Sequence, residues 1–129
     1  MPSHFWINKK EIKMELVALL SSGKGTWGQV AGLINQGEWD NIVLLGDDFA
    51  SKFTSNKKFD FVKVDLNKKL AELREEFSRN LAGKIKGTEV ALTIASGDGK
   101  EHMALISALL HIPVGIRFAA LTKNGIIDL

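Results

Sequence analysis

The sequence predicts an α/β domain, in which a mostly parallel β-sheet carries helices on both faces and ends in an antiparallel β-hairpin. Two observations support this fold class. From Met14 onward, short continuous apolar runs, which are typical of strands buried on both faces, alternate with amphipathic segments. Near the C-terminus, two apolar segments flank Asn124-Gly125, a dipeptide preferred in two-residue hairpin turns. Because parallel neighbours need long crossover connections, the alternation favours a parallel sheet.

The length and composition fit one globular domain. The chain has 129 residues, of which 45% are hydrophobic and 25% charged, and this excludes a disordered protein. The absence of cysteine excludes a disulfide scaffold, Cys-ligated zinc and a thiol nucleophile. A net charge of +2 is too low for a protein that coats duplex DNA. The longest apolar run, Leu16–Leu20, is far shorter than the ~20 residues of a membrane span, so we expect a cytoplasmic protein without membrane association.

Six apolar segments are predicted to be strands. Four are short continuous runs, as expected for buried parallel strands, and the last two form the hairpin. In order, they are Leu16–Leu20, Ile42–Leu45, Phe61–Val64, Val90–Ala95, Ile116–Leu121 and Ile126–Leu129. Residues 1–13 precede them without a clear period. We interpret residues 1–13 as a leader or an extra N-terminal segment, and residues 14–129 as the domain.

Three helices and one short helical crossover are predicted to connect the first five strands. The first helix opens at Thr26, where Gln29 completes a capping box, and ends at Gly37. The crossover lies around residues 49–53. The second helix, 66–82, has the clearest helical period, with apolar residues at Leu66, Leu70, Leu73, Phe77 and Leu81. The third follows the loop at 96–100, with apolar residues at Met103, Leu105, Ile106, Leu109 and Leu110.

Two loops rich in Ser, Gly and Lys follow predicted strands, at 21–26 and 96–100. In an open parallel sheet, ligands bind beyond the carboxyl ends of the strands, where helix N-termini favour anions. Serine hydroxyls and lysine side chains in these loops are suited to a phosphate, whereas the simpler alternative is that Gly only makes tight turns. The expected ligand-binding residues are Ser21, Ser22, Gly23, Lys24, Gly25, Thr26, Ser96, Gly97, Asp98, Gly99 and Lys100.

The first loop also fits a rival class of nucleotide site. It lacks the spacing of a P-loop, but Gly23, Gly25 and Gly28 have the G-x-G-x-x-G spacing of a dinucleotide site. Asp47 stands roughly where a ribose-binding acid belongs, although it equally suits a cap of the next helix. Trp27 suits either stacking on a base or packing on the sheet. A nucleotide- or dinucleotide-dependent enzyme with a Rossmann core is therefore the alternative.

Residues 93–105, TIASGDGKEHMAL, resemble the fourth-strand motif of CARF (CRISPR-associated Rossmann-fold) domains. In that motif a hydroxyl residue, glycines and a Lys or Arg four positions beyond the hydroxyl lead into a helix with Met and Ala. The matching residues are Ser96, Gly97 and Lys100. Ile94 stands where the family usually has an acid or amide, and Asp98 replaces a common second glycine. The loop at 21–26 is similar to the family's other ligand loop, and the terminal hairpin resembles its last two strands.

The resemblance implies a Rossmann-like homodimer that senses cyclic oligoadenylate second messengers in CRISPR-linked antiviral defence. Two copies of both loops would surround one ring of phosphates and adenines across the two-fold axis. The resemblance implies no cofactor. Most CARF domains precede an effector domain, and because this chain ends at Leu129, directly after the last predicted strand, we expect a stand-alone or effector-less member.

Ring nucleases, related enzymes that degrade these messengers, are the further alternative. They need no metal, because each adenosine 2′-OH attacks its own neighbouring phosphate. For such an enzyme we expect Lys100 to supply positive charge and His102 to act as general base, while Ser22, or else Ser21 or Ser96, positions the 2′-OH or a phosphate oxygen. Binding without turnover needs only the same cations and hydroxyls, so the sequence is compatible with both a receptor and an enzyme.

Overall fold

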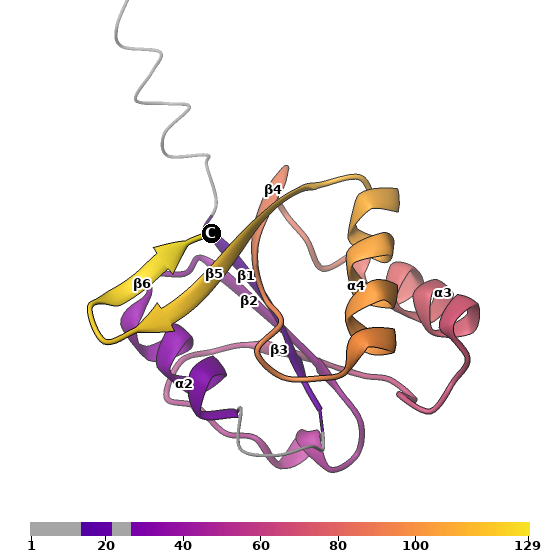
Figure 1. Cartoon of the computed structure of the whole chain (residues 1–129), viewed down its shortest axis with the longest axis horizontal. Helices are drawn as coiled ribbons and strands as arrows, with labels where there is room; N and C mark the ends of the chain where they lie inside the picture. The colour runs from indigo at the N-terminus through magenta and orange to yellow at the C-terminus, as the bar shows by residue number, and fades with distance from the viewer. Residues whose placement is uncertain (1–13, 22–26) are drawn as a thin grey trace, which may run out of the picture.

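The computed structural model describes residues 14–21 and 27–129 of the chain, and residues 1–13 and 22–26 lie outside the described part. The described residues form one six-stranded sheet with the order β3-β2-β1-β4-β5-β6 (Figure 1). The strands are β1 (Glu15–Leu20), β2 (Asn41–Gly46), β3 (Asp60–Lys63), β4 (Glu89–Thr93), β5 (Gly115–Thr122) and β6 (Gly125–Asp128). The helices are α2 (Trp27–Gln36), the 3₁₀ helix η1 (Ala50–Lys52), α3 (Leu70–Leu81) and α4 (Gly99–His111). The predicted α/β class is confirmed.

The strand order reverses between β1 and β4. The chain first builds the sheet outward from β1 through β2 to β3, then returns to place β4 on the other side of β1. Strands β1 to β5 run parallel to one another, and β6 is antiparallel to β5. In such sheets the reversal point opens a crevice beyond the carboxyl ends of the two central strands. The fold therefore puts the end of β1 and the end of β4 at the preferred ligand position.

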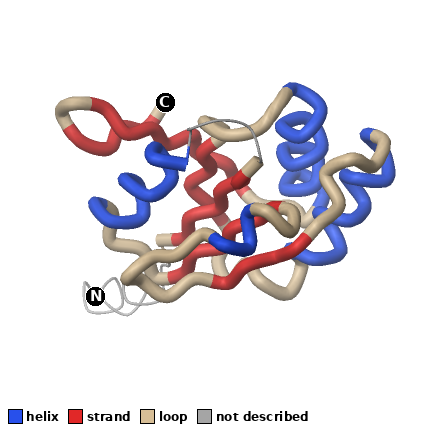
Figure 2. Tube along the Cα trace, turned by 90° about the horizontal axis from the view of Figure 1, so that it is seen from below, coloured by secondary structure: helices blue, strands red, loops and turns tan. Residues whose placement is uncertain are grey.

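Helices cover both faces of the sheet, as predicted. Figure 2 shows α2 on one side of the strands and the pair α3 and α4 on the other. Alternate residues of β1 point to opposite faces. Leu16, Ala18 and Leu20 join the core under α2, whereas Val17 and Leu19 join the core under α3 and α4. Because β1 contributes to both cores, its end is held rigidly at the centre of the molecule.

Several predicted details differ from the structure. Gln29, predicted to complete a capping box, instead exchanges hydrogen bonds with the backbone of Leu121 on β5, while Thr26 lies outside the described residues. The second long helix begins at Leu70 rather than at residue 66. The hairpin is present, but its turn residues are Lys123 and Asn124, since Gly125 already pairs with Thr122. These differences leave the predicted topology unchanged.

A buried carboxylate fastens the opposite, amino end of β1. Glu15 accepts hydrogen bonds from Asn41 Nδ2 (2.6 Å), from the Lys86 N–H (2.7 Å) and from the Gly87 N–H (2.5 Å). These bonds join β1 to β2 and to the segment that leads into β4. The sequence reasoning did not single out Glu15, because a lone Glu at the start of an apolar run shows none of these partners.

Among the described residues, no helix is long and apolar enough to cross a membrane.

Candidate functional site

The two predicted ligand loops meet at the carboxyl edge of the sheet. The backbone N–H of Ser21, directly after β1, donates a hydrogen bond of 2.9 Å to the side-chain Oγ of Ser96, which follows β4. Ser96 is only 1% exposed, so its hydroxyl lies inside the junction. The prediction that both loops lie on one edge is confirmed for Ser21 and Ser96. The other predicted residues of the first loop, Ser22, Gly23, Lys24, Gly25 and Thr26, lie outside the described residues, and their roles stay predictions.

Gly97 allows the second loop to approach β1 closely. Its φ of +111° lies in the left-handed region that side chains disfavour. A Cβ at this position would stand 2.5 Å from Leu19 Cδ2 and 3.0 Å from His102 Nε2. The positive φ therefore favours glycine at position 97, and a Cβ there would also force the side chains of Leu19 and His102 to shift.

The N-terminus of α4 is capped by its own side chains. Asp98 is the N-cap residue: its Oδ1 accepts from the Glu101 N–H (2.8 Å), and the Asp98 N–H donates to Glu101 Oε1 (3.1 Å). This reciprocal pattern is a capping box, and Glu101 is buried within it. Two carboxylates thus occupy part of the helix end that was predicted to attract phosphate. Sequence reasoning missed Glu101, although an acid three residues after Asp98 is the signature of this cap.

Lys100 is held by backbone oxygens of the connection between β3 and α3. Its ammonium group donates to the Leu66 carbonyl oxygen at 2.9 Å and to the Lys68 carbonyl oxygen at 2.8 Å. A lysine ammonium has three N–H donors, so these two bonds take most of its capacity. Lys100 lies at the carboxyl edge, as predicted, and a phosphate there would have to share it with this connection.

His102 is half-buried, and Nε2 of its ring faces the junction. Its Nε2 lies 3.0 Å from the carbonyl oxygen of Ser96. A carbonyl oxygen only accepts hydrogen bonds, so Nε2 donates in this bond, and Nδ1 is the ring nitrogen left for other contacts. If His102 acts as a general base, it acts through Nδ1. The structure therefore brings Ser21, Ser96 and His102 together.

Aromatic side chains flank the end of β1. The indole N–H of Trp27 donates to the Ser21 carbonyl oxygen (2.7 Å), and its ring packs 5.5 Å from Phe49 and 5.9 Å from Phe53 between ring centroids. Trp27 therefore braces the strand end. Phe49, by contrast, is 53% exposed beside the carboxyl edge. The sequence did not indicate Phe49 as a candidate site residue.

The acids after β2 have structural partners. Asp47 Oδ1 accepts from the Ala50 N–H (3.2 Å) and so caps η1, the alternative considered for it above. Asp48 pairs with Lys63 at 2.6 Å, and this hydrogen bond and charge raise the pKa of Lys63 above its ordinary 10.5. In a dinucleotide site, a ribose hydroxyl would therefore compete with the Ala50 N–H for the carboxylate of Asp47.

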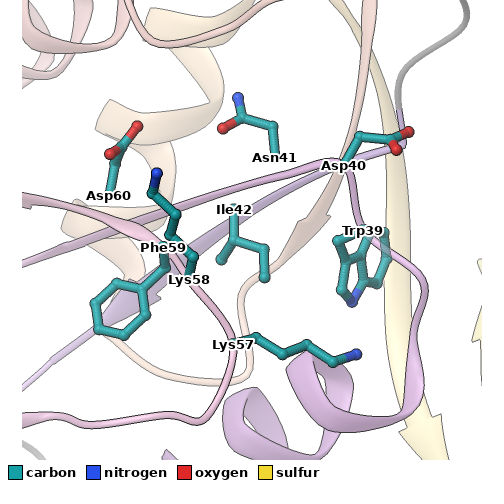
Figure 3. A pocket seen from close by; sticks show the side chains of 8 residues that line it. All are labelled: Trp39, Asp40, Asn41, Ile42, Lys57, Lys58, Phe59 and Asp60. Carbon is teal, nitrogen blue, oxygen red and sulfur yellow. The ribbon is translucent and has the colours of Figure 1, made fainter.

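Among the described residues, pockets lie at both the carboxyl and the amino ends of β2 and β3. A pocket of about 590 Å³ lies at the carboxyl ends of β2 and β3, lined by Asp47, Asp48, Phe49, Lys63, Val64, Asp65, Asn67 and Glu76. The other, of about 440 Å³, lies at the amino ends of the same strands (Figure 3). There Trp39 and Phe59 stand on either side of Ile42, and Lys57 donates to the Gly37 carbonyl oxygen. This second pocket lies at the edge opposite Ser21 and Ser96.

The fold and the junction at Ser96 define the class: a Rossmann-like α/β domain with a candidate ligand site at its topological switch point. No protein-family model matches the chain, and no curated protein sequence matches it either. Within residues 14–21 and 27–129, no group of three or more His, Asp or Glu side chains is placed to hold a metal ion.

Proposed function

We propose that this chain is a nucleotide-binding receptor, and that the carboxyl edge between β1 and β4 takes a cyclic oligoadenylate in CRISPR-linked defence. The observation that carries the proposal is the hydrogen bond from the Ser21 N–H to Ser96 Oγ. It joins the two Ser- and Gly-rich loops, 75 residues apart, at the position where open α/β sheets bind ligands. The resemblance of residues 93–105 to the CARF motif supports the choice of nucleotide.

The partners of Lys100 and His102 support binding as the primary activity. Lys100 donates to two backbone carbonyl oxygens, and His102 donates through Nε2 to the Ser96 carbonyl oxygen. With one N–H donor left, Lys100 would have to give up one of these bonds to make two or more contacts to a transition state. Binding of a phosphate needs less, because one remaining N–H donor of Lys100 and the loop hydroxyls are sufficient contacts.

Ring cleavage is the second candidate, favoured by the position of His102, whose Nε2 lies 3.0 Å from the Ser96 carbonyl oxygen. In this reaction a 2′-oxygen bonds to the neighbouring phosphorus and its proton passes to a base, while the bond from phosphorus to the 5′-oxygen breaks and the leaving 5′-oxygen takes up a proton from water to become a hydroxyl. Incubation with labelled cyclic tetra-adenylate without metal tests it. A linear product ending in a cyclic phosphate supports cleavage, and its absence at a stoichiometric ratio leaves a receptor. Turnover that survives Lys100→Ala would remove Lys100 from the chemistry.

Isothermal titration calorimetry tests the receptor proposal. We expect cyclic tetra- or hexa-adenylate to bind more tightly than ATP or NAD. Lys100→Ala should weaken that binding, whereas Lys58→Ala, which removes the same charge at the amino-edge pocket of Figure 3, should leave it unchanged. Binding of NAD alone would overturn the proposal and favour a dinucleotide-dependent enzyme. An equal loss of affinity in both variants would show that binding depends on the net charge of the protein and not on the position of Lys100.

A further inference from the structure

The amino-edge pocket has two aromatic walls that the described residues leave open toward each other (Figure 3). Trp39 and Phe59 stand on either side of Ile42, and both rings are half-buried, whereas Ile42 is only 3% exposed. Each ring is also held from outside the pocket. The Trp39 indole N–H donates to the Leu33 carbonyl oxygen at 2.8 Å, and Phe59 packs edge-on against Phe53 with 5.8 Å between ring centroids. Walls fixed in this way form a preorganised site of about 440 Å³ for a third flat apolar group.

The chain enters the described fold at the rim of this pocket. The Met14 N–H donates to Asp40 Oδ2 at 2.8 Å, and the Met14 carbonyl oxygen accepts from the Asp40 N–H at 2.7 Å. Asp40 is itself one of the residues that line the pocket. The 13 residues that precede Met14 are therefore tethered directly beside the two aromatic walls.

These 13 residues contain a group that fits such a site. Phe5, Trp6 and Ile7 are three large apolar residues in succession, and each aromatic ring has ~150–250 Å² of surface to bury. Trp6 lies eight residues before Met14. At ~3.3–3.6 Å per residue, eight residues span up to ~26–29 Å, which is enough to reach every wall of the pocket.

We propose that the N-terminal segment of this chain docks in the amino-edge pocket, with the indole ring of Trp6 between Trp39 and Phe59. A third ring in this position would lie within the ~4.5–7 Å between centroids that aromatic pairs favour. Trp6 suits the position better than Phe5, because a buried indole N–H needs an acceptor and the Asp60 carboxylate at the rim offers one. A phenyl ring has no such donor.

The tether decides between the segment of the same chain and that of a second copy. A short tether gives an effective concentration in the millimolar range, about 100-fold above that of a second copy at tens of micromolar. The attachment at Met14 therefore favours docking within one chain. The pocket lies at the edge opposite Ser21 and Ser96, so this docking neither needs nor excludes the nucleotide site of the proposed function.

NMR spectroscopy of the whole chain tests the docking. The chain has three Trp residues, so the indole N–H signal of Trp6 can be assigned by its loss in Trp6→Ala. We expect nuclear Overhauser contacts from the Trp6 ring to the side chains of Ile42 and Phe59, with intensities that do not change when the protein is diluted. Contacts that weaken on dilution would show that a second copy fills the pocket and would overturn docking within one chain.

Amide shifts of the variants give an independent readout. Trp6→Ala should shift the backbone amide signals of Trp39 and Phe59, whereas Ser3→Ala, a change in the same segment that removes no ring, should leave them in place. Larger shifts from Phe5→Ala than from Trp6→Ala would overturn the choice of Trp6. Amide signals that stay in place in all three variants, together with no contacts from the Trp6 ring, would overturn the docking itself.

Discussion

Replacing Ser96 by alanine tests whether the hydrogen bond at the junction between β1 and β4 stabilises the fold. Ser96→Ala removes the acceptor of the Ser21 N–H, whose bond to Oγ is 2.9 Å long. Since Ser96 is 1% exposed, water cannot easily replace the lost oxygen. A donor left unsatisfied in a buried position costs about 1–3 kcal/mol. For a chain of 129 residues, this corresponds to a fall in Tm of about 4–11 °C.

The assay is urea unfolding followed by circular dichroism, with Ser78→Ala as the matched control. Ser78 lies inside α3, and its buried Oγ has no hydrogen-bond partner among the described residues. Its removal leaves no donor unsatisfied, and Ala favours a helix, so the free energy of unfolding should stay equal or rise slightly. A Ser96→Ala variant as stable as the Ser78→Ala variant would refute the account of the junction.

Three further predictions concern the residues that hold the site in place. Gly97→Ala should lower the Tm and perturb the 96–100 loop, because the new Cβ would meet Leu19 and the φ is positive; a heteronuclear NMR spectrum unchanged around residue 97 would contradict this. Glu15→Ala, which leaves three donors unsatisfied, should cost about 3–5 kcal/mol in urea unfolding, and Glu15→Gln less. Asp48→Asn should lower the pKa of Lys63 toward its ordinary value, as measured by NMR titration of the Lys63 side chain; an unchanged pKa would show that the 2.6 Å pair does not form in solution.

The topology could be predicted from the sequence because it depends on patterns that are local. Apolar runs separated by amphipathic segments indicate buried parallel strands and their crossovers, whatever their partners are. The carboxyl ends of parallel strands lie on the same edge of a sheet. The meeting of Ser21 and Ser96 therefore followed from the predicted topology without knowledge of any contact.

The contacts of individual side chains could not be predicted in the same way. Lys100 binds the Leu66 carbonyl oxygen 34 residues away, and Gln29 exchanges bonds with Leu121 over 92 residues. No local sequence pattern distinguishes a lysine that donates to backbone carbonyl oxygens from a lysine that binds a phosphate. The capping box of Asp98 and Glu101 is different, since its spacing is local and would have predicted the occupied N-terminus of α4.

NMR mapping of the bound ligand tests the central claim most directly. Cyclic tetra-adenylate is titrated into ¹⁵N-labelled protein, and the backbone amide shifts are followed at both edges of the sheet. We predict the largest changes at Ser21, Ser96 and His102, around the junction of β1 and β4. Changes confined to Trp39 and Lys58, which line the amino-edge pocket of Figure 3, or no changes at all, would contradict a nucleotide site at the carboxyl edge.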